Sequence, residues 1–271
     1  NPFVYDDANK IAITISSVMK AMVDISKYEL FKELQVIQAI ENISILLKEM
    51  YPKMNEGMLP NLEDMLKMFT NFDLVEKMCR ILEHDEDLKE KYNTQLVYFK
   101  NNFYKDAPNK RNTEIFISVV ADILDRLLRV PGVKSILCNR HNNINFDKSL
   151  ANGEITFVCT RRGDLGASNH KAFGLFFLIS MQNAVLRRPG NEKSRVPNFL
   201  YIDEFPDFIC KATEPIFTMY RKYKIGTVIS AQNLEQLNVS GEKQTILANC
   251  VSKIFTGGGV KEELEWWSTE F

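Results

Sequence analysis

The period of the hydrophobic residues changes at Pro131-Gly132, and this change constrains the fold more than any other feature of the sequence. Before it, apolar residues recur every three or four positions, as on one face of an α-helix. After it, short apolar runs alternate with helical segments, which is typical of a mainly parallel sheet covered by helices. The sequence therefore predicts an α/β fold in two parts: an all-α helical domain at residues 12–130 and an α/β domain at residues 131–271.

The first part predicts a helical bundle with a core rich in leucine, isoleucine and methionine. Asn61 is predicted to cap a helix, because Glu63 and Asp64 then fall in the first turn, where the helix dipole favours acids. No strand is expected before about residue 134. Further helices are expected at about residues 11–22, 30–47, 71–84, 93–103 and 113–129, the last ending at Pro131-Gly132.

The second part predicts alternating strands and helices. Strands joined through helices pair in parallel, and ligands bind at the carboxyl ends of such strands. The predicted strands cover residues 154–160, 198–203, 225–231 and 251–256. The predicted helices cover residues 168–187, 214–222, 243–249 and 262–269.

Composition and charge exclude several classes of protein. A formal net charge of −1 does not fit a polycationic nucleic-acid binder. The five cysteines and three histidines are scattered without a CxxC motif, so we expect neither disulfides nor a zinc site. The same pattern predicts that the protein resides in a reducing compartment. Residues 1–130 carry 17 Lys/Arg and 21 Asp/Glu, a net charge of −4, whereas residues 157–226 carry 11 and 6, a net charge of +5. The longest apolar run, residues 172–181, is too short to span a bilayer, which needs roughly 20 residues.

The sharpest local signal is an apolar run at residues 199–202 that leads directly into Asp203 and Glu204. Two carboxylates at the carboxyl end of a buried strand are costly unless a cation offsets their charge. A Walker B strand has this arrangement: its first acid orients the shell of a bound Mg²⁺, and its second positions or deprotonates the attacking water. A simpler interpretation, an acidic helix cap beside a solvated acid, stays open at this point.

Two later residues favour the nucleotide-site interpretation. Gln232 follows the next predicted strand, where its amide can hydrogen-bond the attacking water or a γ-phosphate. Arg221 precedes that strand and can reach the nucleotide of a neighbouring subunit as an arginine finger. Taken singly, Gln232 is more simply a helix cap and Arg221 a solvated charge. Their order on successive strand–helix units favours the functional interpretation.

The sequence contains no GxxxxGK[ST] phosphate loop, and Gly257-Gly258-Gly259 is expected to form a turn. The chain begins at Asn1 without an initiator methionine, so we expect it to be a piece of a longer protein. Without the backbone amides and lysine of a phosphate loop, the β- and γ-phosphates of a nucleotide have no cradle. We therefore expect this piece alone to hold no cofactor and to hydrolyse ATP negligibly.

With these residues in view, the second part resembles the conjugative coupling ATPases of type IV secretion systems, the TraG/TraD family. The resemblance covers about residues 150–271, and the family's glycine is displaced by two positions, to Gly226. The first part is similar, by position and helicity, to the all-α domain that this family inserts before its Walker B strand. The matching segments are Leu200-Tyr-Ile-Asp-Glu-Phe-Pro206, Arg221-Lys-Tyr-Lys-Ile-Gly-Thr-Val-Ile-Ser-Ala-Gln232, Gln236-Leu237, Ile246-Leu-Ala-Asn249, Lys253-Ile-Phe-Thr-Gly257 and Glu263-Leu-Glu-Trp-Trp-Ser268.

The resemblance implies a partial RecA-like parallel sheet, its Walker B half, with the all-α domain as an insertion. It implies a hexameric, ATP-driven DNA motor, anchored at the cytoplasmic face of a bacterial membrane, that recruits the relaxase–DNA complex to the secretion channel. Its partners would be relaxosome proteins, DNA and channel proteins. With ATP and Mg²⁺ as cofactors of the intact protein, Asp203 would hold Mg²⁺ through water and Glu204 would be the catalytic carboxylate. Arg221 would be the finger in trans, and Gln232 the sensor.

Two other functions stay open: the channel-assembly ATPase of the same systems, and a non-catalytic adaptor. Phe205-Pro206 after the two acids favours the coupling protein. The helical domain is expected to fold alone and to bind a protein rather than DNA, because its negative net charge repels phosphates. Its methionines suit adaptable protein recognition or, more simply, fill the core; they include Met50, Met54, Met58, Met65 and Met68.

Overall fold

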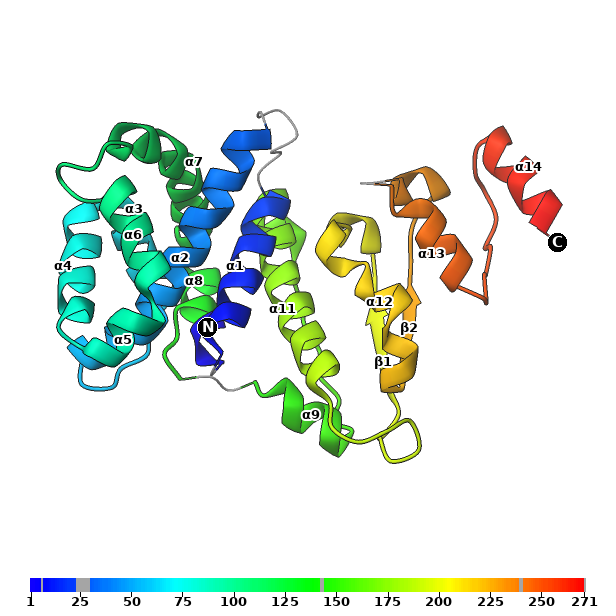
Figure 1. The fold of residues 1–271 in the computed structure, drawn as a ribbon. Helices are drawn as coiled ribbons and strands as arrows, with labels where there is room; N and C mark the ends of the chain where they lie inside the picture. Colours follow the sequence, from blue (N-terminus) through cyan, green and yellow to red (C-terminus); the bar gives the residue numbers. More distant parts are fainter. Residues whose placement is uncertain (6, 23–29, 142–143, 239–240, 271) are drawn as a thin grey trace. The chain divides into compact units, whose positions relative to one another are not determined.

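The computed structural model describes residues 1–5, 7–22, 30–141, 144–238 and 241–270. The chain forms two compact units (Figure 1). Unit 1 contains residues 1–144 and 160–176, and unit 2 contains residues 145–159 and 177–271. The division expected from the sequence was into a recognition domain at residues 12–130 and an NTPase core at residues 131–271. Because it was drawn by function and the two units are defined by contacts, it stays a prediction.

Unit 1 is built from helices, and the described residues before Asn198 contain no strand, as predicted for the chain up to residue 134. Helices α1 and α2 pack along each other, and α3, α4 and α7 also contact α2 (Figure 1). Pro131 begins a new helix where we expected one to end, because proline fits the first helical position. The helices are α1 (Ala8–Met22), α2 (Leu30–Met54), α3 (Leu62–Thr70), α4 (Phe72–Glu83), α5 (Glu86–Lys91), α6 (Asn93–Asn102), α7 (Lys110–Leu128), α8 (Pro131–Leu137), α10 (Arg162–Leu165) and α11 (Ala167–Arg187), whose second half lies in unit 2.

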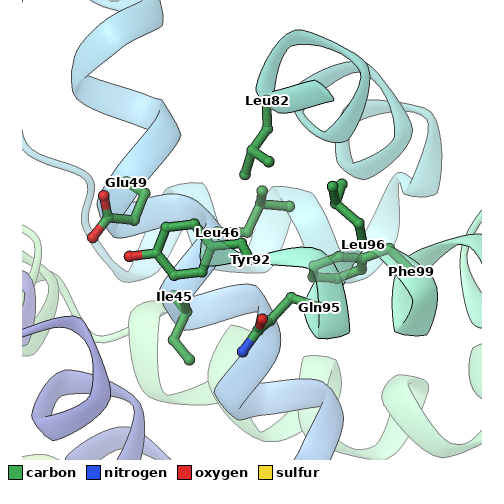
Figure 2. Close-up of a pocket in the computed structure, with 8 residues that line it drawn as sticks. All are labelled: Ile45, Leu46, Glu49, Leu82, Tyr92, Gln95, Leu96 and Phe99. Atoms are coloured by element: carbon green, nitrogen blue, oxygen red, sulfur yellow. The ribbon is translucent and has the colours of Figure 1, made fainter. Parts of the chain in front are cut away.

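The core of unit 1 lies along α2. Leucine and aromatic side chains from α4 and α6 close on this helix, as Figure 2 shows for Leu46, Leu82 and Phe99. The void among them measures about 10 Å³, so the core is filled at this point. Most of the methionines that suggested adaptable recognition also lie in the core: Met50, Met65 and Met68 are buried, whereas Met58 is exposed.

A partly buried polar cluster links three segments of unit 1. The Asn61 side chain accepts hydrogen bonds from the Glu63 and Asp64 amides, and Asp64 accepts one from the Asn61 amide, so the predicted cap is a complete capping box. Asp64 is 4% exposed, and its Oδ2 accepts a hydrogen bond of 2.8 Å from the Arg140 guanidinium. Arg140 also donates to the Tyr51 hydroxyl at 3.0 Å. These contacts join α2, α3 and the segment after α8.

Unit 2 contains a two-stranded parallel sheet, β1 (Asn198–Ile202) and β2 (Ile225–Ile229). Asn198 pairs with Ile225 and Ile202 with Ile229, which confirms the strands predicted at 198–203 and 225–231. The sheet supports the coarse expectation of a partial α/β fold. The remaining elements are α9 (Phe146–Asn152), α12 (Pro215–Thr218), α13 (Lys243–Asn249) and α14 (Lys261–Glu270), with short 3₁₀ turns at Phe205–Phe208, Lys211–Thr213, Tyr220–Tyr223 and Leu234–Leu237.

The other two predicted strands are wrong for this structure. Residues 154–160 and 251–256 are assigned to no strand, and their apolar side chains are exposed: 93% for Phe157 and 88% for Ile254. A strand requires a neighbour for its backbone N–H and C=O groups, and within the described residues neither segment has one. The helix expected at 214–222 is split at Met219 into α12 and a 3₁₀ turn. Across the described residues, no helix combines the length and the apolar character needed to cross a membrane.

Arg188 ties the elements of unit 2 together. Its side chain is 8% exposed, and it donates hydrogen bonds of 2.8 Å to the carbonyl oxygens of Tyr223, Leu150 and Val196. Burial lowers the pKa of Arg188, and the charge of Arg195 lowers it further. One side chain therefore links α9, the segment before β1 and the turn before β2.

Arg188→Met should lower the free energy of unfolding of unit 2 by about 2–3 kcal/mol, because three carbonyl groups lose their charged donor. Urea denaturation of the purified chain measures the change. Arg221→Met is the matched control: Arg221 is exposed in the same unit, and its replacement should change stability by less than about 0.5 kcal/mol. Equal losses for the two variants would contradict the role of Arg188.

Candidate active site

Parallel pairing brings the carboxyl ends of β1 and β2 to the same edge of the sheet. The pairing continues past the strands: the Ser230 amide donates to the Ile202 carbonyl at 3.1 Å, and the Phe205 amide donates to the Ser230 carbonyl at 3.0 Å. Asp203 and Glu204 therefore lie beside Ser230. This is the edge at which ligands bind in parallel α/β sheets.

The Ser230 hydroxyl links the two acidic residues. It donates to Asp203 Oδ1 at 2.5 Å and accepts a hydrogen bond of 3.0 Å from the Glu204 amide. That amide also points at Asp203 Oδ1, at 3.2 Å. The Asp203 carboxylate is thus oriented by two donors while it remains exposed. Sequence reasoning treated Ser230 as part of a strand and missed this role; its place beside the two acids follows only from the pairing.

Glu204 has a backbone conformation that is unusual for a residue with a side chain. Its φ is 49° and its ψ is 47°, in the left-handed region that favours glycine. The next residue, Phe205, is fully buried and packs edge-on against Phe217 at 5.3 Å between ring centroids. Burial of Phe205 holds the chain in this turn, and the turn leaves the Glu204 carboxylate exposed at the sheet edge.

Gln232 contacts the second acid directly. Its Nε2 donates to Glu204 Oε1 at 3.1 Å, and its own amide N–H donates to Gln236 Oε1 at 3.1 Å. The structure thus brings Asp203, Glu204 and Gln232 together, and it adds Ser230 and Gln236. This group of carboxylate, hydroxyl and amide side chains can orient a water molecule and accept its proton.

Arg221 does not join this group. It lies in the 3₁₀ turn before β2, whereas Gln232 follows β2, so the two residues flank opposite ends of a strand that is about 16 Å long. Its side chain is exposed. Arg221 therefore lies at the opposite end of β2 from the candidate site of its own chain. A role in a neighbouring subunit stays a prediction.

The oxygen donors at this edge decide which ion fits. In the part of the chain that the structure describes, no group of three His, Cys, Asp or Glu side chains is arranged to hold a metal ion. Asp203 and Glu204 offer two exposed carboxylates. Mg²⁺ is commonly held by one or two carboxylates and completes its shell with water and phosphate oxygens. The site therefore suits a hydrated Mg²⁺ better than a metal enclosed by protein ligands.

Comparisons with known proteins agree with the resemblance seen in the sequence. Residues 197–271, which contain the candidate site, match a family model described as the TraM recognition site of TraD and TraG. A solved structure, the bacterial conjugative coupling protein TrwBdeltaN70 in an unbound monoclinic form, matches 90% of this chain with a TM-score of 0.55 and 16% sequence identity. This chain spans 51% of that structure. No match was found among curated proteins. The resemblance to the TraG/TraD family is thus confirmed at residues 197–271. The similarity of fold to the solved coupling-protein structure extends over 90% of this chain.

Ser230→Ala should free the Glu204 amide from its hydroxyl acceptor. The loss of one hydrogen bond, about 1 kcal/mol, should speed hydrogen exchange of this amide about fivefold. Exchange measured by NMR on the purified chain gives the rate. Ser230→Thr keeps the hydroxyl and should retain the protection. Unchanged exchange in Ser230→Ala would show that the hydroxyl does not hold Glu204.

Proposed function

We propose that this chain carries the Walker B half of the nucleotide site of a conjugative coupling protein, an ATP-driven hexameric motor that moves DNA to a secretion channel. The observation that carries the proposal is the convergence of Asp203, Glu204 and Gln232 at one sheet edge, inside the residues that match the family model. The same match favours a coupling protein over the channel-assembly ATPase, because the model describes TraD and TraG.

The side chains at the sheet edge suit the two tasks of a Walker B segment. Asp203, oriented by Ser230, would hold hydrated Mg²⁺, which when bound offsets the charge that develops on the phosphate oxygens. Glu204 would accept a proton from the attacking water. Gln232 already donates to Glu204 and would keep the carboxylate and the water aligned, as a sensor of the γ-phosphate.

Arg221 would act in trans. Its place before β2 keeps it from the site of its own chain, and its exposure leaves it available to a neighbouring subunit. An arginine finger supplied by a neighbour stabilises the charge of the transition state only when the oligomer is assembled. This placement supports a homohexamer in which each site lies between two subunits.

The exposed apolar segments support a sheet that is wider in the intact protein. Residues 154–160 and 251–256 expose apolar side chains, including 93% of Phe157 and 88% of Ile254, and β1 exposes 65% of Phe199 and 70% of Tyr201. Strand edges and apolar sheet faces are normally paired or covered. Further strands, including one that leads into a phosphate loop, would cover these groups and complete a RecA-like core.

Unit 1 would recruit the cargo. The charge of residues 1–130 disfavours the DNA backbone, so we assign this unit to protein recognition, with a relaxase or another relaxosome protein as partner. The description of the matching family model points to TraM as one such partner of residues 197–271. The intact protein would act at the cytoplasmic face of the bacterial membrane, beside the channel proteins.

Arg221→Ala in the full-length protein should lower the ATP turnover of the assembled oligomer by about 10³-fold and leave the monomer unaffected. Lys222→Ala, the exposed neighbour, is the matched control and should keep near-normal turnover. Steady-state hydrolysis under assembling and dilute conditions separates the two cases. Equal turnover of wild type and Arg221→Ala in the oligomer would remove Arg221 from the site.

The chain of residues 1–271 alone should show negligible ATP hydrolysis, because it has no phosphate loop to hold the nucleotide. A phosphate-release assay on the purified chain tests this expectation. Turnover that is abolished by Glu204→Gln would mean that the phosphates bind to groups other than a phosphate loop, and it would overturn the proposed division of the site.

A further inference from the structure

Unit 1 contains a cavity lined by apolar side chains and by several side-chain amides. It lies among α2, α6 and α7 and has a volume of about 340 Å³, within the usual range of ligand pockets. None of its lining residues is charged. Tyr98 and Phe116 supply aromatic surface. Five carboxamides face this space: Gln35, Gln38, Asn102, Asn109 and Asn112.

Among these amides, the Asn102 side chain makes hydrogen bonds within the protein. It donates to the Tyr98 carbonyl at 2.7 Å, and its oxygen accepts from the Thr113 hydroxyl at 3.4 Å. Gln35 Oε1 is buried without a hydrogen-bond partner, a costly state for an amide oxygen. Within the described residues, the side chains of Gln38 and Asn112 make no hydrogen bond, although both line the cavity. The Gln38 and Asn112 amides line one cavity without charged neighbours in its lining, and this favours a polar, uncharged ligand.

We propose that this cavity binds an extended, uncharged segment of a partner polypeptide. An extended backbone presents N–H and C=O groups in alternation, and a carboxamide can pair with one of each. Tyr98, Phe116 and the buried Ile117 offer apolar contacts for side chains between these pairs. The ligand lacks charged side chains at this point, because the lining has no opposite charge to pair with them.

A nucleic acid fits the cavity less well. Carboxamides can also bind base edges, but the affinity of such complexes comes largely from Lys and Arg contacts to phosphates. The lining contains neither residue, and residues 1–130 carry 17 Lys/Arg against 21 Asp/Glu. The inference rests on the proposed function only for the identity of the partner as a relaxosome protein; the binding itself depends on the cavity alone.

Selection of a random dodecapeptide phage library on the full chain tests the proposal. Selected sequences are synthesised with capped ends, and their Kd values are measured by fluorescence anisotropy. We expect uncharged peptides whose affinity falls at least about tenfold in Gln38→Leu and in Asn112→Leu, because leucine keeps the size of the side chain and removes both hydrogen-bonding groups. Both residues are exposed, so the variants should fold normally. Asn93→Leu, an exposed asparagine of α6 outside the cavity, is the matched control and should bind like wild type.

Three results would overturn the proposal. The first is a selection that yields no peptide. The second is equal or tighter binding to Gln38→Leu and Asn112→Leu, which would place the peptides elsewhere or attribute binding to apolar contact. The third is binding of an oligothymidine that is lost in the same two variants, which would assign the cavity to nucleic acid. A failed test of ATP turnover in the full-length protein would leave this result unaffected, because the selection uses neither nucleotide nor oligomer.

Discussion

The candidate site depends on the register of two parallel strands. Ile202 lies opposite Ile229, so the next residues of each strand meet at the sheet edge. A slip by one residue would turn every side chain of the strand to the other face and separate Ser230 from Asp203. Gly226 lies opposite Phe199, and a Cβ atom at this glycine would come within 2.8 Å of the phenylalanine ring. Close packing at the start of the pair thus helps to fix the contacts at its end.

One arginine stabilises each unit, and the two arginines do so by different means. In unit 1, Arg140 pairs with the Asp64 carboxylate at the start of α3, so the charge is matched where it is buried. In unit 2, Arg188 donates only to carbonyl oxygens among the described residues. Its acceptors lie 8 to 38 positions away along the chain, so no local pattern marks them. Arg188 therefore stabilises unit 2 by binding backbone carbonyl groups from three separate segments.

Local signals and the parallel pairing of β1 with β2 were predictable, whereas the fate of the other two predicted strands was not. The Asn61 capping box follows from residue types at fixed spacing, and the structure confirms it. The strands ending at Asp203 and near Gln232 follow from apolar runs, and the parallel sheet then places these residues together. Residues 154–160 have the same composition as a strand but remain unpaired in the described chain, because pairing depends on a second segment. Ser230 acquires its role from its neighbour across the sheet, which no single-strand pattern encodes.

The displaced glycine of the family pattern has a structural explanation that the sequence could not provide. The pattern R-x-x-G, counted from Arg221, places glycine at position 224, where this chain has lysine. Lys224 has a φ of 61° and a ψ of 40°, the left-handed conformation that glycine adopts without strain. Gly226 is in close contact with the Phe199 ring, so it does not compensate for Lys224.

Lys224 and Glu204 are the left-handed non-glycine residues of the described part of unit 2. One precedes β2 and follows Arg221; the other follows β1 at the candidate site. Backbone strain of about 1–2 kcal/mol per residue is therefore held at the turns that present the proposed finger and the proposed catalytic carboxylate, where the adjacent strand pairing can support it.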